Sequence, residues 1–232
     1  MNPLQSRRTL LAAVAAMGTF PHALVRAQTP VPNAGADQGG QGPRTAVPTI
    51  KPFIEIGRFE EDKDRLFMFM QYTCPFCASL HGPIVTWAQT LPSPMKLVTI
   101  PLGEDNDATR ASIFAHYAVR EIAPKQLEAY SQSAYQVGQS ANPTAAGYLS
   151  ILPKLGLKRE AVVSAINSPR TRDRVMRGLR LASRYRVTVT PTFGVAGRWT
   201  TNPGFTSGKS QDLVALLNVL VTTAIQGGDL TI

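Results

Sequence analysis

The apolar residues between positions 53 and 101 predict a β-α-β unit. Residues 66–72 are apolar at nearly every position, which is typical of a strand covered on both faces of a sheet. A short strand is predicted before this run, at residues 53–56, and a helix after it, from Pro75 to about residue 89. A second strand over residues 96–101 completes the unit.

Helical patterns fill residues 107–185, with breaks at Pro124, Asn142-Pro143, residues 153–156 and Ser168-Pro169. Strand character returns at residues 187–189, 192–195 and 198–200. Ser210 is expected to cap a final amphipathic helix with one apolar side, formed by Leu213, Leu217, Leu220 and Ala224. The sequence therefore predicts an α/β fold interrupted by an all-helical insertion.

The N-terminus has the features of an export signal. Arg7 and Arg8 form a basic start, a stretch rich in Ala and Leu follows, and small or apolar residues precede a cleavage point after Ala27. The run around the two arginines resembles a twin-arginine signal, so this route and the general secretory route both stay open. An uncleaved anchor is the alternative, but the apolar stretch is short for a membrane span. Either way, the folded part is expected outside the cytosol, where disulfides persist.

Domain boundaries follow from composition and from the predicted elements. Residues 1–27 are assigned to the export signal, and residues 28–48, rich in Pro, Gly and Gln, are expected to form a flexible linker. Residues 49–106 and 186–232 together form the predicted α/β domain. The helical subdomain, residues 107–185, is inserted between its two parts.

Composition narrows the chemistry that the chain can perform. The 232 residues are 44% hydrophobic and carry a formal net charge of +9, which fits one or two compact globular units. Outside the N-terminus no apolar run is long enough for a membrane span. The chain has two cysteines, Cys74 and Cys77, which excludes a disulfide-stapled scaffold and a zinc site built from four thiolates.

The motif Cys74-Pro75-Phe76-Cys77 lies where the predicted buried strand ends and a helix begins. Proline suits the first helical position, which places Cys74 at the helix cap and Cys77 one turn further on the same side. Two thiols at this spacing can close a small disulfide. The free N–H groups and positive dipole of the helix start favour an anion at Cys74, so Cys74 is the expected nucleophile and Cys77 the expected resolving thiol.

The same CxxC spacing also occurs in half of a zinc site. Outside the export signal the histidines are His81 and His116, and His81 falls on the helix side that carries Cys77. These residues do not make a full tetrahedral set, so no metal site is predicted. Both histidines are interpreted as ordinary helix residues.

A second segment, Val189-Thr190-Pro191-Thr192-Phe193, places a proline at the start of a predicted strand. Because proline cannot donate a backbone hydrogen bond, it is expected at the first residue of a strand or in a cis turn. Alone, Pro191 would be interpreted as an ordinary edge proline. Its occurrence after a CxxC helix makes it a candidate part of the same site.

The order of these motifs resembles the DsbA-type thiol-disulfide oxidoreductases of the bacterial periplasm. The resemblance rests on FMQYTCPFCASLH, a helical insertion, VTPTFGVAGRW and a terminal helix. It implies a thioredoxin fold with an inserted helical domain, a cis Pro191 against the Cys74–Cys77 disulfide, and substrate binding by the backbone of Thr190. It also implies no cofactor beyond the redox-active disulfide, which a quinone-linked membrane oxidase of the DsbB type would reoxidise.

Departures from that family leave open the reduction potential of the cysteine pair and the net direction of its reaction. Well-known members carry His where this chain has Phe76, and the strand over residues 96–101 lacks a charged residue in its middle. Thr190 before the proline also occurs in isomerase-type relatives. Pro75 and Phe76 are the residues expected to tune the active site.

The leading hypothesis is an enzyme that donates the Cys74–Cys77 disulfide to exported proteins during oxidative folding. A disulfide isomerase or reductase kept in the dithiol state is the first alternative, and a redox-silent binding module or metal chaperone is the second. The expected partners are reduced exported proteins and the membrane oxidase, the expected location is the periplasm, and a monomer is the expected state.

A basic run covers residues 154–186, with ten Lys or Arg residues against two acidic ones. Nucleic-acid binding is one interpretation of such a run. However, Val175, Leu179 and Ala182 predict a buried helix stripe with arginines on the other sides, which is typical of a solvated face, and no nucleic-acid partner is expected. Attraction to an anionic membrane surface or to acidic clients is the interpretation that stays open.

Overall fold

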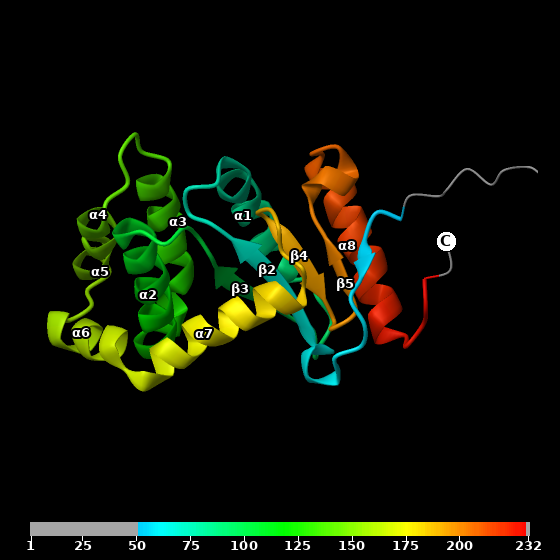
Figure 1. The fold of residues 1–232 in the computed structure, drawn as a ribbon, viewed down its shortest axis with the longest axis horizontal. Coiled ribbons are helices and arrows are strands. Elements are labelled where there is room, and N and C mark those ends of the chain that lie inside the picture. The colour runs from blue at the N-terminus through cyan, green and yellow to red at the C-terminus, as the bar shows by residue number, and fades with distance from the viewer. Residues whose placement is uncertain (1–50, 231–232) are drawn as a thin grey trace, which may run out of the picture. The chain divides into compact units, whose positions relative to one another are not determined.

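The computed structural model describes residues 51–230; the predicted export signal and linker, residues 1–27 and 28–48, lie outside them. The described chain forms a five-stranded sheet in the order β1-β5-β4-β2-β3 (Figure 1). The strands are β1 (Ile54–Glu55), β2 (Arg65–Met70), β3 (Lys96–Pro101), β4 (Thr192–Val195) and β5 (Trp199–Thr201). β2 and β3 run parallel, and the other neighbouring strands run antiparallel.

β2 lies between β4 and β3 and is buried on both faces. Leu66, Met68 and Met70 pack into the larger of two hydrophobic cores. Phe67 and Phe69 belong to the second core, on the opposite face. Since successive side chains of a strand point to opposite faces, an apolar run of this length needs cover on both sides. The prediction of a central strand in this run is confirmed.

Helices cover the two faces of the sheet. α1 (Pro75–Ala88) and α8 (Ser210–Ile225) contribute to the larger core, where three leucines of α8 are buried: Leu213, Leu217 and Leu220. α7 (Pro169–Arg184) covers the opposite face with Leu181, and Tyr185 follows directly after the helix. Each side of β2 therefore has its own helical cover.

Six helices lie between β3 and β4; the first five form a group beside the sheet, and the last, α7, runs from this group along a face of the sheet (Figure 1). They are α2 (Asp107–Ile122), α3 (Leu127–Gly138), α4 (Ala145–Leu149), α5 (Ile151–Lys154), α6 (Arg159–Asn167) and α7. Tyr130, Ala134 and Tyr148 of these helices belong to the same core as the residues of β2. The predicted helical insertion is confirmed. It packs against the sheet and shares a hydrophobic core with it.

Two details of the predicted elements are wrong. Residues 187–189 form no strand, because the backbone N–H of Val187 donates to the carbonyl of Ala182 at 2.9 Å and closes the end of α7. Ser210 is the first residue of α8 rather than its cap. Lys209 occupies the cap position, where no side chain forms a capping hydrogen bond.

The buried side of α7 also differs from the predicted one. The stripe Val175, Leu179 and Ala182 is not the inner face, since Leu179 is 50% exposed. The buried residues of the helix are Thr171, Gly178 and Leu181. Leu181 and Tyr185 pack against the aromatic residues of β2, and this orientation of the helix turns Leu179 outward.

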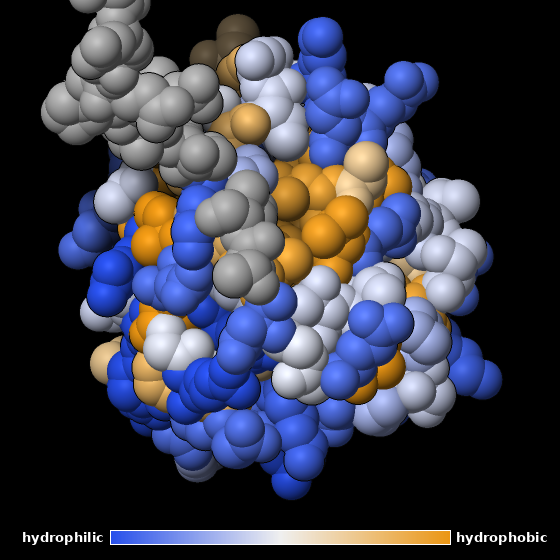
Figure 2. All heavy atoms as spheres, turned by 90° about the vertical axis from the view of Figure 1, so that its right-hand side faces the viewer, coloured by the Kyte–Doolittle hydropathy of each residue, from blue (hydrophilic) through white to orange (hydrophobic). Residues whose placement is uncertain are grey.

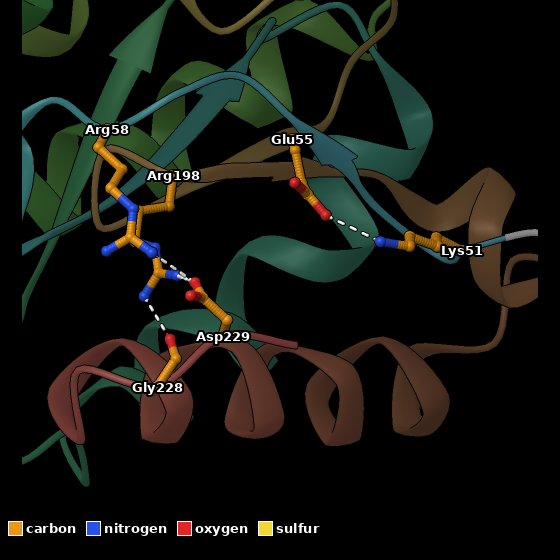
Figure 3. Close-up of polar contacts among 6 residues, drawn as sticks. All are labelled: Lys51, Glu55, Arg58, Arg198, Gly228 and Asp229. Atoms are coloured by element: carbon orange, nitrogen blue, oxygen red, sulfur yellow. Dashed lines mark hydrogen bonds and ion pairs between the residues drawn. The ribbon is translucent and has the colours of Figure 1, made fainter. Parts of the chain in front are cut away.

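Charged side chains connect the segment after α8 to Arg58, which follows β1, and to Arg198, which lies between β4 and β5 (Figure 3). Arg58 and Arg198 both donate to the carboxylate of Asp229, and Arg198 also donates to the carbonyl of Gly228 at 2.7 Å. Figure 2 views the side on which α8 lies, where hydrophobic residues gather among mostly hydrophilic ones. Because the Asp229 carboxylate is 72% exposed and so largely screened by solvent, these contacts position the segment after α8 more than they stabilise the fold.

α3 approaches the loop between β2 and α1 through a glycine. A Cβ atom at Gly138 would lie 2.1 Å from the carbonyl oxygen of Tyr72, which only glycine permits. The side-chain amide of the next residue, Gln139, donates to the same carbonyl at 3.0 Å. The insertion therefore holds the loop that leads into α1.

We expect Gly138→Ala to lower the free energy of unfolding by roughly 1–3 kcal/mol, because the added methyl group forces the Tyr72 backbone or α3 to move. Urea unfolding followed by circular dichroism measures the change. Gly228→Ala is the matched control, since a Cβ there meets Thr223 at an ordinary 3.5 Å. Equal stability of the two variants would contradict the proposed close contact.

Candidate active site

The two cysteines lie at the start of α1. Cys74 is the N-cap residue and Pro75 the first residue of the helix, as predicted from the sequence. The backbone N–H of Cys77 donates to the Sγ atom of Cys74 at 3.4 Å. This hydrogen bond satisfies one of the free N–H groups of the first turn and holds the Cys74 sulfur beside Cys77.

The two thiols, which are not linked in the structure, differ in accessibility. Cys74 is partly exposed, whereas Cys77 is fully buried. Burial, which disfavours the thiolate, raises the pKa of Cys77 to about 12, and the neighbouring Cys74 adds to this effect. Cys77 is therefore a neutral thiol at physiological pH, and Cys74 is the sulfur that a second protein can reach.

A segment far along the chain completes the site. The Sγ atom of Cys74 donates to the carbonyl oxygen of Thr190 at 3.2 Å. The peptide bond between Thr190 and Pro191 is cis, and β4 begins at the next residue. Because β4 pairs with β2, the sheet brings this segment beside the end of β2. The structure thus brings together the predicted site residues from both parts of the chain: Cys74, Pro75, Phe76, Cys77, Thr190 and Pro191.

A groove of about 370 Å³ opens beside these residues. Its wall is formed by Phe76, by the segment before β4 and by the turn after β5, with the lining residues Phe76, Val189, Thr190, Pro191, Asn202, Pro203, Gly204, Ser207 and Gly208. Phe76 is 62% exposed and Val189 is 52% exposed. Exposed apolar side chains that line a concave surface are typical of a binding site, here next to Cys74.

Buried aromatic residues lie next to Cys77, and no sequence pattern identified them. The ring of Tyr72 packs edge-on against Tyr130 and Tyr135, and its hydroxyl lies 2.8 Å from Nδ1 of His116. Burial lowers the pKa of His116 to about 3, so its ring is neutral at physiological pH. Tyr130 and Tyr135 come from α3, His116 comes from α2 and Tyr72 follows β2, so no local sequence pattern links the whole cluster.

His81 is also buried, on the side of α1 that carries Cys77. Its Nε2 atom lies 3.0 Å from a carboxylate oxygen of Glu128 on α3, and its ring contacts Tyr135. The side chain therefore links α1 to the insertion, a role that the sequence did not predict. Residues 51–230 contain no group of three or more His, Cys, Asp or Glu residues that could hold a metal ion.

Comparison with known proteins identifies the family. A family model described as thioredoxin matches residues 59–207, more than half of the chain. The thiol:disulfide interchange protein DsbA of Bordetella parapertussis is 24% identical over 141 residues, which cover 61% of this chain and 67% of the relative. DsbA of Bordetella pertussis is 23% identical over the same lengths.

Solved structures show the same fold. DsbA of Pseudomonas aeruginosa superimposes with a TM-score of 0.62 at 20% identity, covering 76% of this chain and 94% of that chain. The oxidoreductase DsbA of Xylella fastidiosa gives 0.60 at 19% identity, with coverage of 75% and 96%. The chain therefore belongs to the thioredoxin family, with the DsbA-type form of the fold in which helices are inserted. Within residues 51–230, no helix combines the length and apolar character needed to cross a membrane.

We expect iodoacetamide to modify Cys74 but not Cys77 in the folded, reduced protein at about pH 8. Below its pKa of about 12 the Cys77 thiol stays protonated, and its side chain is not exposed. Mass spectrometry of the Cys77→Ser variant should show one adduct, and the Cys74→Ser variant should show none until urea unfolds it. Rapid labelling of folded Cys74→Ser protein would mean that Cys77 is accessible.

Proposed function

We propose that this protein is a thiol-disulfide oxidoreductase that donates a Cys74–Cys77 disulfide to exported proteins. The observation that carries the proposal is an accessible cysteine paired with a buried one at a helix start, with the Thr190 carbonyl beside the accessible sulfur. Membership of the thioredoxin family and the likeness to DsbA proteins support it. Cys74 acts as the nucleophile of the pair and Cys77 as the resolving residue.

The reaction begins with a client thiolate that attacks the Sγ atom of Cys74 in the disulfide form. The Cys74–Cys77 bond breaks, a mixed disulfide forms, and Cys77 leaves as a thiolate that takes up a proton. A second client thiolate then attacks the client sulfur of the mixed disulfide and releases Cys74 as a thiolate. The client loses two electrons and the cysteine pair gains them. Because Cys77 is buried, the attack falls on Cys74.

The groove beside Cys74 would hold the client as an extended segment. Phe76 and Val189 offer apolar contacts, and the backbone at Thr190 and Pro191 lies in the groove wall, where a client main chain would pair. Contacts of this kind depend little on the client's side chains. Such a site therefore suits an enzyme that acts on many unfolded proteins.

Turnover requires an electron acceptor that restores the Cys74–Cys77 disulfide. The resemblance to DsbA-type proteins favours a quinone-linked membrane oxidase of the DsbB type as this acceptor. The disulfide itself carries the electrons, so the proposal includes no further cofactor. It places the protein in the periplasm, as a monomer that meets reduced clients after export by the twin-arginine or the general secretory route.

Thr190 and Phe76 favour a second candidate, an isomerase or reductase kept in the dithiol state, because both differ from the strong oxidases of the family. The resting state of the pair in cells separates the two candidates. Acid quenching followed by a maleimide reagent of high mass shows whether Cys74 and Cys77 carry free thiols. An oxidised pair supports the disulfide donor, and a reduced pair supports the isomerase or reductase.

The Cys77→Ser variant should accumulate mixed disulfides with client proteins. Its Cys74 thiolate attacks a client disulfide, one client sulfur leaves as a thiolate, and no Cys77 thiol is present to attack Cys74 and release the client. Non-reducing gels of cells that express the variant would show these species, and a reducing agent would remove them. Cys74→Ser is the control and should trap nothing. Trapped species that appear with Cys74→Ser alone would reverse the assigned roles.

Phe76→His should raise the reduction potential of the pair by about 30–60 mV. Phe76 offers neither charge nor a hydrogen bond to a Cys74 thiolate, whereas His can offer both. Stabilising the thiolate stabilises the reduced form, and each tenfold gain is worth about 30 mV for two electrons. Redox titration with glutathione measures both proteins, with Phe76→Leu as the control that leaves the potential unchanged. If the Phe76→His variant is folded but its reduction potential is unchanged, the helix start and the Thr190-Pro191 segment set the potential instead of residue 76.

A further inference from the structure

The basic helix α7 turns some of its arginines toward the protein. Arg174 and Arg177 lie on the same side as Gly178 and Leu181, at the spacing of one helix face. This side packs against α2 and against the sheet face opposite α1. Part of the basic run therefore lines a cavity, which Arg177 reaches while it stays exposed to solvent.

Four arginines from three elements line this cavity, which has a volume of about 210 Å³. Arg65 begins β2, Arg120 lies near the end of α2, and Arg174 and Arg177 come from α7. Apolar residues of β2 and β3 complete the wall. Since Arg65 and Cys74 lie at opposite ends of β2, this arginine pocket is separate from the candidate active site.

Tyr117 contributes a buried hydroxyl group to the arginine pocket. The residue is 2% exposed, and its oxygen forms no hydrogen bond within the described part of the protein. Gly178 lies opposite, where a Cβ atom would come within 2.8 Å of that oxygen. Burial raises the pKa of Tyr117 to about 12, so the hydroxyl is a neutral donor at physiological pH. An acceptor inside the pocket would satisfy it.

The positive charge of the pocket is only partly balanced. Arg174 pairs with Glu121 at 3.3 Å, but within residues 51–230 no carboxylate forms an ion pair with Arg120 or Arg177. Burial lowers the pKa of Arg120, and the charges of the other three arginines lower it further. Arg120 is therefore close enough to each of the other three arginines to be repelled by them. The acidic residue close enough to Arg177 for an electrostatic interaction is Glu61. Its carboxylate forms an ion pair with Arg184 instead, at 2.7 Å.

We propose that the arginine pocket binds a small phosphate-bearing anion. Guanidinium groups match phosphate oxygens with paired hydrogen bonds, and Tyr117, in the wall of the same cavity, supplies a neutral donor. The cavity is smaller than the roughly 300 Å³ at which pockets for drug-sized ligands begin, which favours a single phosphate or pyrophosphate group. The four guanidinium groups carry more positive charge than the one paired carboxylate, that of Glu121, can balance. This excess favours a doubly charged phosphate over a monocarboxylate.

Two sources could supply this chemistry: a soluble phosphate compound or the headgroup of an anionic phospholipid. Arg177 is exposed at the mouth of the pocket, and α7 also exposes Met176 and Leu179. Apolar and basic side chains together on an exposed helix are compatible with a lipid surface. The experiment therefore includes separate arms for the two sources.

Calorimetric titration of the purified full chain with pyrophosphate, at constant ionic strength, tests the proposal. Pyrophosphate should bind saturably and raise the melting temperature, whereas acetate should do neither. Arg177→Gln and Tyr117→Phe should each weaken binding about tenfold, because each removes a donor to the anion. Arg180→Gln is the matched control, since Arg180 is exposed on the same helix and does not line the pocket, so the affinity should not change.

Tyr117→Phe provides a second measurement. Without pyrophosphate its melting temperature should equal or exceed that of the wild type, because the lost hydroxyl had no partner in the protein. The Cys74→Ser variant should bind pyrophosphate normally, so failure of the proposed redox function would leave this test intact. Absence of saturable binding to both pyrophosphate and vesicles, or equal weakening by Arg177→Gln and Arg180→Gln, would overturn the proposal.

Flotation with phosphatidylglycerol vesicles, compared with phosphatidylcholine vesicles, is the lipid arm. Binding to the anionic vesicles that Arg177→Gln abolishes and pyrophosphate displaces would support a lipid headgroup as the ligand. Binding of pyrophosphate without binding of vesicles would support a soluble phosphate compound. Vesicle binding that persists in Arg177→Gln, with no pyrophosphate binding, would overturn the site.

Discussion

The burial of β2 on both faces is the constraint on which the rest of the structure depends. Leu66, Met68 and Met70 need the cover of α1 and α8, and Phe67 and Phe69 need that of α7. Because α7 is part of the insertion, the inserted helices are required by the sheet itself. The same strand delivers the chain to the start of α1, so the position of the cysteines follows from this burial.

At the candidate active site, two chemically identical groups are distinguished by their surroundings. Cys74 lies at the helix cap beside a groove, while Cys77 faces the core among tyrosines. The insertion takes part in this difference, since Gly138 and Gln139 hold the carbonyl of Tyr72 and Tyr135 lies in the same core as Cys77. A region without a cysteine of its own thus shapes the environment of the pair.

The sequence predicted the parts of the fold that carry strong local signals. The apolar run of β2, the proline at the start of α1 and the breaks between the inserted helices depend on neighbouring residues, and the structure agrees with them. The hydrogen bond of Cys74 to Thr190 joins residues 116 positions apart, and it was not predicted: the family resemblance placed Pro191 against the cysteine pair and assigned the backbone of Thr190 to substrate binding. The inner side of α7 was not predicted because arginines and Gly178 occupy it, so apolar periodicity pointed to the wrong face. The buried tyrosines were missed because they come together only in three dimensions.

α7 has a mechanical consequence for the molecule. One half of this continuous helix contacts α2, where Arg174 pairs with Glu121, and the other half packs on the sheet through Leu181. A hinge between the insertion and the sheet would have to bend the helix or peel one half away from its partner. The insertion and the sheet are therefore expected to move together as one rigid body, without closing on a bound chain. A chain that binds beside Cys74 has to adapt its own shape to a surface that stays fixed, which a flexible extended segment does more readily than a compact folded surface.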